Sequence, residues 1–247
     1  MIRRITHWLI PMLAVVTLAG TPAHAQQTLD FYVQRNLRDL QSSAAVISKD
    51  DRELAKIGRD FVEAYNLQKR EFFLKEPGCV RMQGKKGVVT VRFITNGNRK
   101  LTEVSSLHIH SVKDLTQAPD EGETALDFGL ITPSVLEKMD GRFLRMEPRG
   151  GKNCAVFEMW FRAQPRPKHT VWLDPATKTV VDHIEHHRGR RRPGFKKRFA
   201  FSEVRQIGGV NVPARVDIYN GENQLAGSSR YENIRVNVGL DDKLFQF

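Results

Sequence analysis

The sequence predicts an α+β protein that is mainly β, with a single long antiparallel sheet and helices packed on one face. Short segments of alternating apolar and polar residues follow one another between residues 70 and 238, as in β-strands. Turn residues separate these segments and no long crossover helix interrupts them, which indicates sequential antiparallel pairing. Helical spacing is confined to residues 28–65 and to a short patch at 132–139. These observations favour one domain, residues 26–247, built around one sheet.

The first 25 residues have the parts of a secretory signal peptide. Arg3 and Arg4 form a positive start, an apolar run follows, and Ala23-His24-Ala25 is an A-x-A cleavage sequence. A retained membrane helix is the alternative, but the run is short for a bilayer span. We therefore expect export to the periplasm as a soluble protein, without a lipid anchor, since no cysteine lies near the cleavage point.

The chain is strongly basic. Its formal net charge is +11, and removal of Arg3 and Arg4 leaves 37 basic against 28 acidic residues, a net charge of +9. Export argues against a nucleic-acid partner and favours an anionic membrane surface or an acidic protein. A solvated positive surface that serves only solubility is the alternative interpretation.

The helical segments come first. Residues 28–47 carry apolar side chains at helical spacing and predict one amphipathic helix, and residues 48–65 predict a second. Ser48 and Asp51 form the S-x-x-D start signal of that second helix. A third, short helix is expected from Thr132, a fair N-cap, followed by Pro133 at the first helical position.

Strands account for most of the remaining chain. Asn96-Gly97-Asn98, Gly150-Gly151 and Asn220-Gly221 supply hairpin turns. The predicted strand segments are residues 70–84, 87–97, 101–112, 142–148, 154–164, 169–175, 179–187, 196–207, 212–220 and 228–238.

Alternation places large apolar side chains on one face of the sheet. Two short helices and one helical patch are too few to cover the apolar face of so many strands completely. An apolar concave face that is not completely filled would be a cavity for a lipid-like ligand. Close packing of an ordinary half-buried sheet would give the same pattern and remains the alternative. The candidate cavity wall is Val89, Val91, Phe93, Phe157, Met159, Phe161, Val171, Leu173, Phe199 and Phe201.

A cluster of cations lies between two of the predicted strands. Residues 188–194 have the glycines and proline of a hairpin turn, so the cluster is expected at an exposed tip. Near an anionic bilayer each such charge contributes about 1 kcal/mol, so a docking role is one interpretation and a solvated tip without function is the other. The cluster consists of Arg188, Arg190, Arg191, Arg192, Lys196, Lys197 and Arg198.

Cysteine, histidine and catalytic signals are weak. Cys79 and Cys154 are an even number of cysteines in an oxidising compartment. The sequence is compatible both with a disulfide between them and with two buried, unpaired thiols. His108 and His110 could form half a zinc site, but no third ligand is evident, and no metal or cofactor is expected. No G-x-S-x-G, H-E-x-x-H or P-loop motif occurs, so we expect a binding protein rather than an enzyme.

Three local sequences resemble the LolA-like superfamily of periplasmic outer-membrane lipoprotein carriers and their relatives. They are FLKEPGCVRM at 73–82, VWLDPATKTVVDHIEHH at 171–187, and NVGLDDKLFQF at 237–247. The last of these is similar to the closing strand of the family. It is more similar still to the end of a LolA-like group of unknown function. The resemblance extends over residues 28–247. The family's arginine before the early proline is replaced here by Glu76, so the chain resembles a divergent member.

The resemblance implies a half-open β-barrel whose N-terminal helices and inserted helix cover the concave side. It further implies a cavity that holds the acyl chains of a lipid, lipoprotein or other amphiphile. A carrier is therefore the first functional hypothesis, and a periplasmic sensor that binds a protein partner through the same fold is the second. Displacement of a hydrophobic probe by lipids would favour the carrier, whereas capture of a protein without probe binding would favour the sensor.

Overall fold

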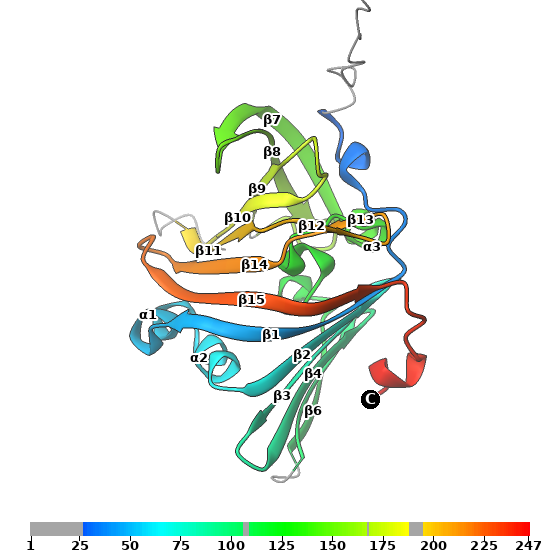
Figure 1. The fold of residues 1–247 in the computed structure, drawn as a ribbon, viewed down its shortest axis with the longest axis vertical. Helices are drawn as coiled ribbons and strands as arrows, with labels where there is room; N and C mark the ends of the chain where they lie inside the picture. Colours follow the sequence, from blue (N-terminus) through cyan, green and yellow to red (C-terminus); the bar gives the residue numbers. More distant parts are fainter. Residues whose placement is uncertain (1–26, 106–108, 167, 188–194) are drawn as a thin grey trace, which may run out of the picture.

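The computed structural model describes residues 27–105, 109–166, 168–187 and 195–247. Within these ranges thirteen strands form one curved antiparallel sheet in the order β6-β5-β4-β3-β2-β1-β15-β14-β11-β10-β9-β8-β7 (Figure 1). The two edge strands, β6 and β7, are not neighbours, so the sheet is a half-open barrel. The predicted mainly β, α+β fold is therefore confirmed. The signal peptide predicted for residues 1–25 lies outside the described residues.

The strands and helices have the following bounds. The first half of the sheet contains β1 (Asp39–Lys49), β2 (Gln68–Lys75), β3 (Cys79–Lys86), β4 (Val89–Asn96), β5 (Arg99–Val104) and β6 (Ile109–Asp114). The second half contains β7 (Met139–Arg149), β8 (Lys152–Phe161), β9 (His169–Leu173), β10 (Val180–His186), β11 (Phe195–Ser202), β14 (Arg215–Asn220) and β15 (Leu225–Val236). The α-helices are α1 (Asp51–Ile57), α2 (Arg59–Tyr65) and α3 (Pro133–Lys138). The 3₁₀ turns are η2 (Leu29–Tyr32), η3 (Pro119–Glu121), η4 (Ala125–Phe128) and η5 (Asp242–Phe245), and β12 (Arg205–Ile207) pairs with β13 (Val210–Val212) in a separate hairpin.

The first predicted helix is wrong. Only η2 is helical in that region, and β1 is an 11-residue strand that pairs with β15 on one side and β2 on the other. Leu40 and Ser42 alternate into the buried face. Hydrogen bonds along both edges of β1 outweigh the modest helical preference of its Ala- and Ser-containing sequence. The strand thereby joins the two halves of the sheet.

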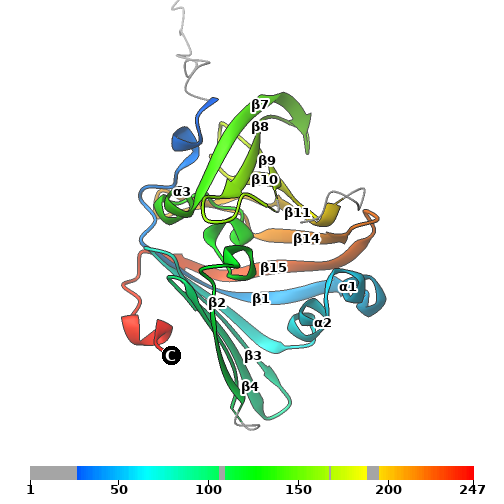
Figure 2. The same cartoon turned by 180° about the vertical axis from the view of Figure 1, so that it is seen from behind.

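The second and third helices are confirmed, with changes. The second is divided at Gly58 into α1 and α2, and its N-cap is Asp50 rather than Ser48, because the Asp50 side chain accepts hydrogen bonds from the backbone nitrogens of Arg52 and Glu53. Helix α3 follows Thr132 as expected. Figure 2 shows α1 and α2 at one end of the concave side and α3 towards the other.

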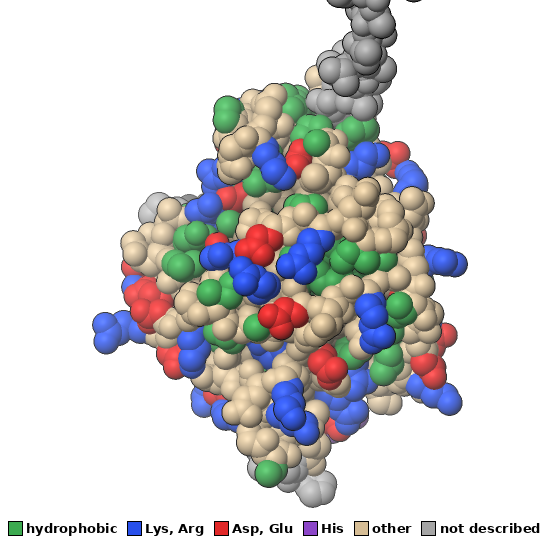
Figure 3. Space-filling model, in the orientation of Figure 1, with side chains coloured by type: hydrophobic (Ala, Val, Ile, Leu, Met, Phe, Trp, Pro, Cys, Tyr) green, Lys and Arg blue, Asp and Glu red, His purple; other side chains and the backbone are tan. Residues whose placement is uncertain are grey.

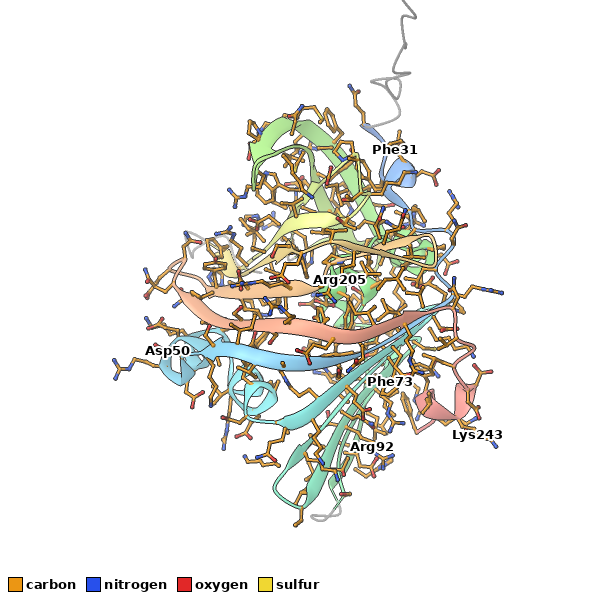
Figure 4. The ribbon with its side chains drawn as sticks, in the orientation of Figure 1. Phe31, Asp50, Phe73, Arg92, Arg205 and Lys243 are labelled. Carbon is orange, nitrogen blue, oxygen red and sulfur yellow. The ribbon has the colours of Figure 1, made fainter. Side chains whose placement is uncertain are left out.

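Several predicted strands end early. Residues 101–112 belong to two strands, β5 and β6, and residues 196–207 to β11 and β12. The closing segment 237–247 is not a strand, since Asn237 and Gly239 have positive φ and direct the chain into η5. Leu240 and Phe245 then pack with Phe73 on the outer side of β2 (Figure 4).

The main core lies between the inner face of the sheet and the segment that connects the two edge strands. Residues 115–138 cross the concave side from β6 to β7 and include η3, η4 and α3 (Figure 2). Gly129, at φ +76°, ends η4 against the sheet, and a Cβ atom there would lie 2.9 Å from Cδ1 of Phe201. No helix within the described ranges is long and apolar enough to cross a bilayer.

Candidate functional site

A cavity of about 690 Å³ lies on the concave side of the sheet. Helix α2, the segment 120–128 and the inner faces of both halves of the sheet form its wall. This volume is within the roughly 300–1,000 Å³ of small-ligand sites. Its apolar lining is Ile57, Phe61, Ala64, Tyr65, Leu67, Phe72, Met82, Phe93, Leu126, Phe128, Phe161, Phe199, Val216, Ile218 and Tyr231.

One row of the wall follows the strand register. Phe72, Met82, Phe93, Thr102 and Ser111 are successive cross-strand partners from β2 to β6. Because directly opposed residues share a face, all five line the cavity. The row is apolar next to the centre of the sheet and polar at its edge.

An aromatic cluster lines part of the cavity. The ring of Phe72 lies 5.5 Å from those of both Phe128 and Tyr231, in edge-to-face geometry. Tyr65, at the end of α2, packs on β15 where Gly227 leaves room, since a Cβ atom at Gly227 would lie 2.5 Å from Cε1 of Tyr65. These contacts fix α2 and η4 to the sheet beside the cavity.

A polar group of side chains forms another part of the wall. His169 and His183 are buried, and Nδ1 of His169 lies 2.9 Å from Nε2 of His183. Burial lowers the pKa of His169 to about 4 and that of His183 well below its ordinary value, so both rings are neutral at pH 7. The remaining nitrogens, Nε2 of His169 and Nδ1 of His183, are buried without a hydrogen-bond partner.

A buried ion pair lies beside the two histidines. Lys197, whose side chain is 14% exposed, is 2.9 Å from Glu185. Burial opposes the charge of Glu185, but Lys197 and Lys196 stabilise it and hold its pKa at about 2. The alternation in the sequence predicts an apolar wall, and this prediction is wrong for the part formed by β9, β10 and β11, where His169, His183 and Glu185 line the cavity.

The predicted wall residues divide into three groups. Phe93, Phe161 and Phe199 line the cavity. Val89 and Val91 are half-buried on β4, outside the lining. The others are buried in the main core: Phe157, Met159, Val171, Leu173 and Phe201.

The basic residues are not one exposed cluster. Arg188, Arg190, Arg191 and Arg192 lie outside the described residues. Lys196 is 2.8 Å from Glu185, Lys197 faces the cavity, and Arg198 is 2.7 Å from the buried Asp182 on the outer face. The expectation of a common exposed tip is thus wrong for Lys197 and Arg198. Elsewhere on the outer face Lys and Arg are interspersed with Asp and Glu (Figure 3).

The structure also answers two questions that the sequence left open. Cys79 and Cys154 are both free thiols, so the disulfide interpretation is wrong; they belong to different clusters, Cys79 beside Phe73 and Cys154 beside Trp172. His110 is exposed, and His108 lies outside the described residues. The described part of the chain contains no group of three or more His, Cys, Asp or Glu side chains that could hold a metal ion.

Comparison with solved structures places this architecture among LolA-like folds. A DUF1329 family protein from Desulfovibrio piger superposes with a TM-score of 0.61 at 12% identity, covering 90% of this chain and 95% of that one. A putative outer membrane lipoprotein-sorting protein domain from Vibrio parahaemolyticus gives 0.60 at 13% identity, with 90% and 97% covered. A LolA superfamily protein from Nitrosomonas europaea gives 0.57 at 12% identity, with 92% and 99% covered.

The chain therefore has the fold of LolA-like proteins, and the resemblance noted in its sequence is confirmed at the level of the fold. No protein-family model matches the sequence, and no curated protein is significantly similar to it. The fold is thus shared at identities of 12–13%.

Proposed function

We propose that this protein is a periplasmic binding and carrier protein that holds the hydrocarbon part of a lipid, lipoprotein or other amphiphile in the cavity. The observation that carries the proposal is the 690 Å³ cavity itself, whose apolar wall includes Phe72, Met82, Phe93 and Phe199. Each methylene group transferred from water to such a wall contributes about 0.8 kcal/mol. A chain of several methylenes would therefore bind without covalent chemistry.

The comparisons support the same class of ligand. One of the solved structures with this fold is described as a putative outer membrane lipoprotein-sorting protein domain. The signal sequence expected at residues 1–25 would deliver this chain to the periplasm. The proposed role is binding; two of the cations of the wall, Lys197 and Lys100, are held in ion pairs with Glu185 and Glu123.

The test is displacement of a neutral fluorescent probe, N-phenyl-1-naphthylamine, by acyl-chain ligands. Wild-type protein is expected to bind the probe and release it when lipid is added. Thr102→Trp would place an indole in the cavity next to Phe93 and is expected to weaken probe binding by about tenfold or more, a loss of about 1.4 kcal/mol.

Thr90→Trp is the matched control. Thr90 lies on β4, the neighbouring strand, three residues from Phe93, which lines the cavity, so the Thr90 side chain is on the opposite, outer face. This variant is expected to bind the probe like the wild type. Equal binding by Thr102→Trp and the wild type, or no binding of the probe at all, would contradict the proposal.

A further inference from the structure

Arg70 is a buried cation on the cavity wall. It lies on β2, two residues before Phe72 and therefore on the same face of the sheet, and its exposed fraction is 6%. Its Nη2 atom donates a hydrogen bond to Oγ of Ser229 at 3.1 Å, and its guanidinium carbon lies 5.2 Å from the centroid of the Tyr65 ring. These are neutral partners from β15 and α2.

No carboxylate compensates this charge. The described residues place no Asp or Glu within ion-pair distance of the Arg70 guanidinium. The ionisable groups that act on its pKa are Tyr65 and Tyr231, which are neutral phenols at pH 7, and burial lowers that pKa. Arginine nonetheless stays protonated in proteins, so a positive charge persists inside the cavity.

The other cations on the wall are different. Lys100 pairs with Glu123 at 2.5 Å, and Lys113 pairs with Glu121. Lys196 and Lys197 share Glu185. Among the described residues that line the cavity, Arg70 alone is a cation without a carboxylate partner. Four of its five N–H donors have no partner within the described protein.

We propose that the ligand is an amphiphile with an acidic head group, a carboxylate or a phosphate, and that Arg70 binds this head group inside the cavity. This inference rests on the proposed function, since it names the class of lipid held there. The guanidinium fork matches two oxygens of either anion, and Ser229 supplies a hydroxyl beside it. The hydrocarbon chain would extend from Arg70 along Phe72, Met82 and Phe93, the apolar part of the cross-strand row.

The energetic reason is desolvation. An unpaired ion buried away from water is costly, and a bound anion would offset this cost with charge-assisted hydrogen bonds. A neutral amphiphile of the same chain length would fill the same apolar wall but leave Arg70 uncompensated. The difference in affinity between acid and alcohol therefore measures the contribution of Arg70.

The experiment uses displacement of N-phenyl-1-naphthylamine from the wild-type protein by hexadecanoate, hexadecyl phosphate and hexadecanol. At least one of the two anions is expected to bind about tenfold or more tightly than the alcohol. The anion that shows this preference distinguishes a fatty-acid ligand from a phosphate-monoester lipid. Arg70→Gln is expected to remove the preference and to leave the affinity for hexadecanol within about twofold.

Arg230→Gln is the matched control. Arg230 lies on β15 between Ser229 and Tyr231, but its side chain is on the outer face and pairs with Glu203 at 2.9 Å. Arg230→Gln makes the same change of charge next to Ser229 on the same strand but on the opposite face, so the preference for the anion is expected to remain.

The outcomes separate the two proposals. If the three amphiphiles bind equally well to the wild type, or if Arg70→Gln keeps the preference, the role of Arg70 is overturned while the carrier proposal stands. If none of them displaces the probe, the carrier proposal fails. The acid-against-alcohol comparison needs only wild-type protein, so the inference stays testable if Arg70→Gln does not fold.

Discussion

Glu76 accepts two hydrogen bonds from Ser134, one from the backbone nitrogen at 3.0 Å and one from the hydroxyl at 2.8 Å. Ser134 is the second residue of α3, where backbone N–H groups have no partner within the helix. The arginine that the LolA-like resemblance would place before Pro77 has no acceptor and could form neither bond. In this chain the carboxylate of Glu76, in the turn between β2 and β3, therefore binds the N-terminus of α3.

Glu76→Gln is expected to destabilise the protein by about 1 kcal/mol, in the range of a lost helix cap. Glutamine keeps one acceptor oxygen and carries no charge, so the bond from the Ser134 nitrogen loses its charge assistance and the bond with the hydroxyl must reverse its direction. Urea unfolding gives the free energy, and hydrogen exchange at the Ser134 amide shows whether the loss is local. Glu137→Gln, at an exposed position of the same helix, is the control and should cost less than about 0.5 kcal/mol. Equal effects of the two substitutions would contradict a capping role for Glu76.

The His169–His183 pair makes stability depend on pH. Both rings are neutral in the folded state, with the pKa of His169 at about 4, whereas the pKa of an unfolded histidine is about 6.5. Between these values the unfolded chain binds more protons than the folded one. Stability contributed by the neutral pair is thus complete above pH 6.5 and falls as the pH is lowered towards 4. The charged or titratable groups that act electrostatically on the pair are Glu185, Lys197, His186 and Asp120.

Replacing the pair tests this dependence. The free energy of unfolding of the wild type should fall between pH 6.5 and 4 by up to about 1.4 kcal/mol per pH unit for each histidine. The double variant His169→Phe/His183→Phe should show a flatter profile in that window. Glu185, with a folded pKa of about 2, contributes a separate loss below about pH 4.5 that should persist in the variant. The exposed His110→Phe serves as control, and an unchanged profile in the double variant would refute the assignment.

Much of the sheet could be predicted from alternation, because period-two patterns report directly which side chains share a face. The inner positions of residues 154–164 are correct for this reason. The same alternation also predicts that two cations lie on the inner face, although the basic residues around them suggest an exposed surface. Lys197 shares a face with Phe199 and Phe201, and Arg70 shares a face with Phe72. Their side chains therefore point to the concave side although the sequence around them is basic.

The rest could not be predicted because it depends on pairing between distant strands. Strand β1 resembles a helix until β2 and β15 are placed on its two edges. The pairing of Lys197 with Glu185 follows from the register of β10 and β11, which no local sequence specifies. Likewise, whether Arg70 finds a carboxylate depends on α2 and β15, which approach it from other parts of the chain.

The two thiols should differ in reactivity. Burial raises the pKa of both thiols, that of Cys154 to about 11, but Cys154 is fully buried whereas Cys79 is half-buried. Iodoacetamide should therefore modify Cys79 first in the folded protein, since the thiolate is the reactive form. Cys154 should react only after unfolding. Mass spectrometry of the exported protein, unfolded without a reducing agent, should then show two modified cysteines. A failure to modify either residue until reductant is added would indicate a disulfide and contradict the structure.

The contact between Gly227 and Tyr65 supports the wall next to Arg70. Gly227 has strand geometry, so alanine suits its backbone, but the added Cβ would lie 2.5 Å from Cε1 and 2.6 Å from Cζ of Tyr65. Gly227→Ala is therefore expected to displace the Tyr65 ring and to cost about 1–3 kcal/mol, as in other overpacked sites. In a Tyr65→Ala background the same substitution has nothing to collide with and should cost less than about 0.5 kcal/mol. Urea unfolding of the four proteins in this double-mutant cycle gives the coupling energy. A full cost of Gly227→Ala in both backgrounds would show that its effect comes from the backbone of β15 and not from the tyrosine that covers the guanidinium.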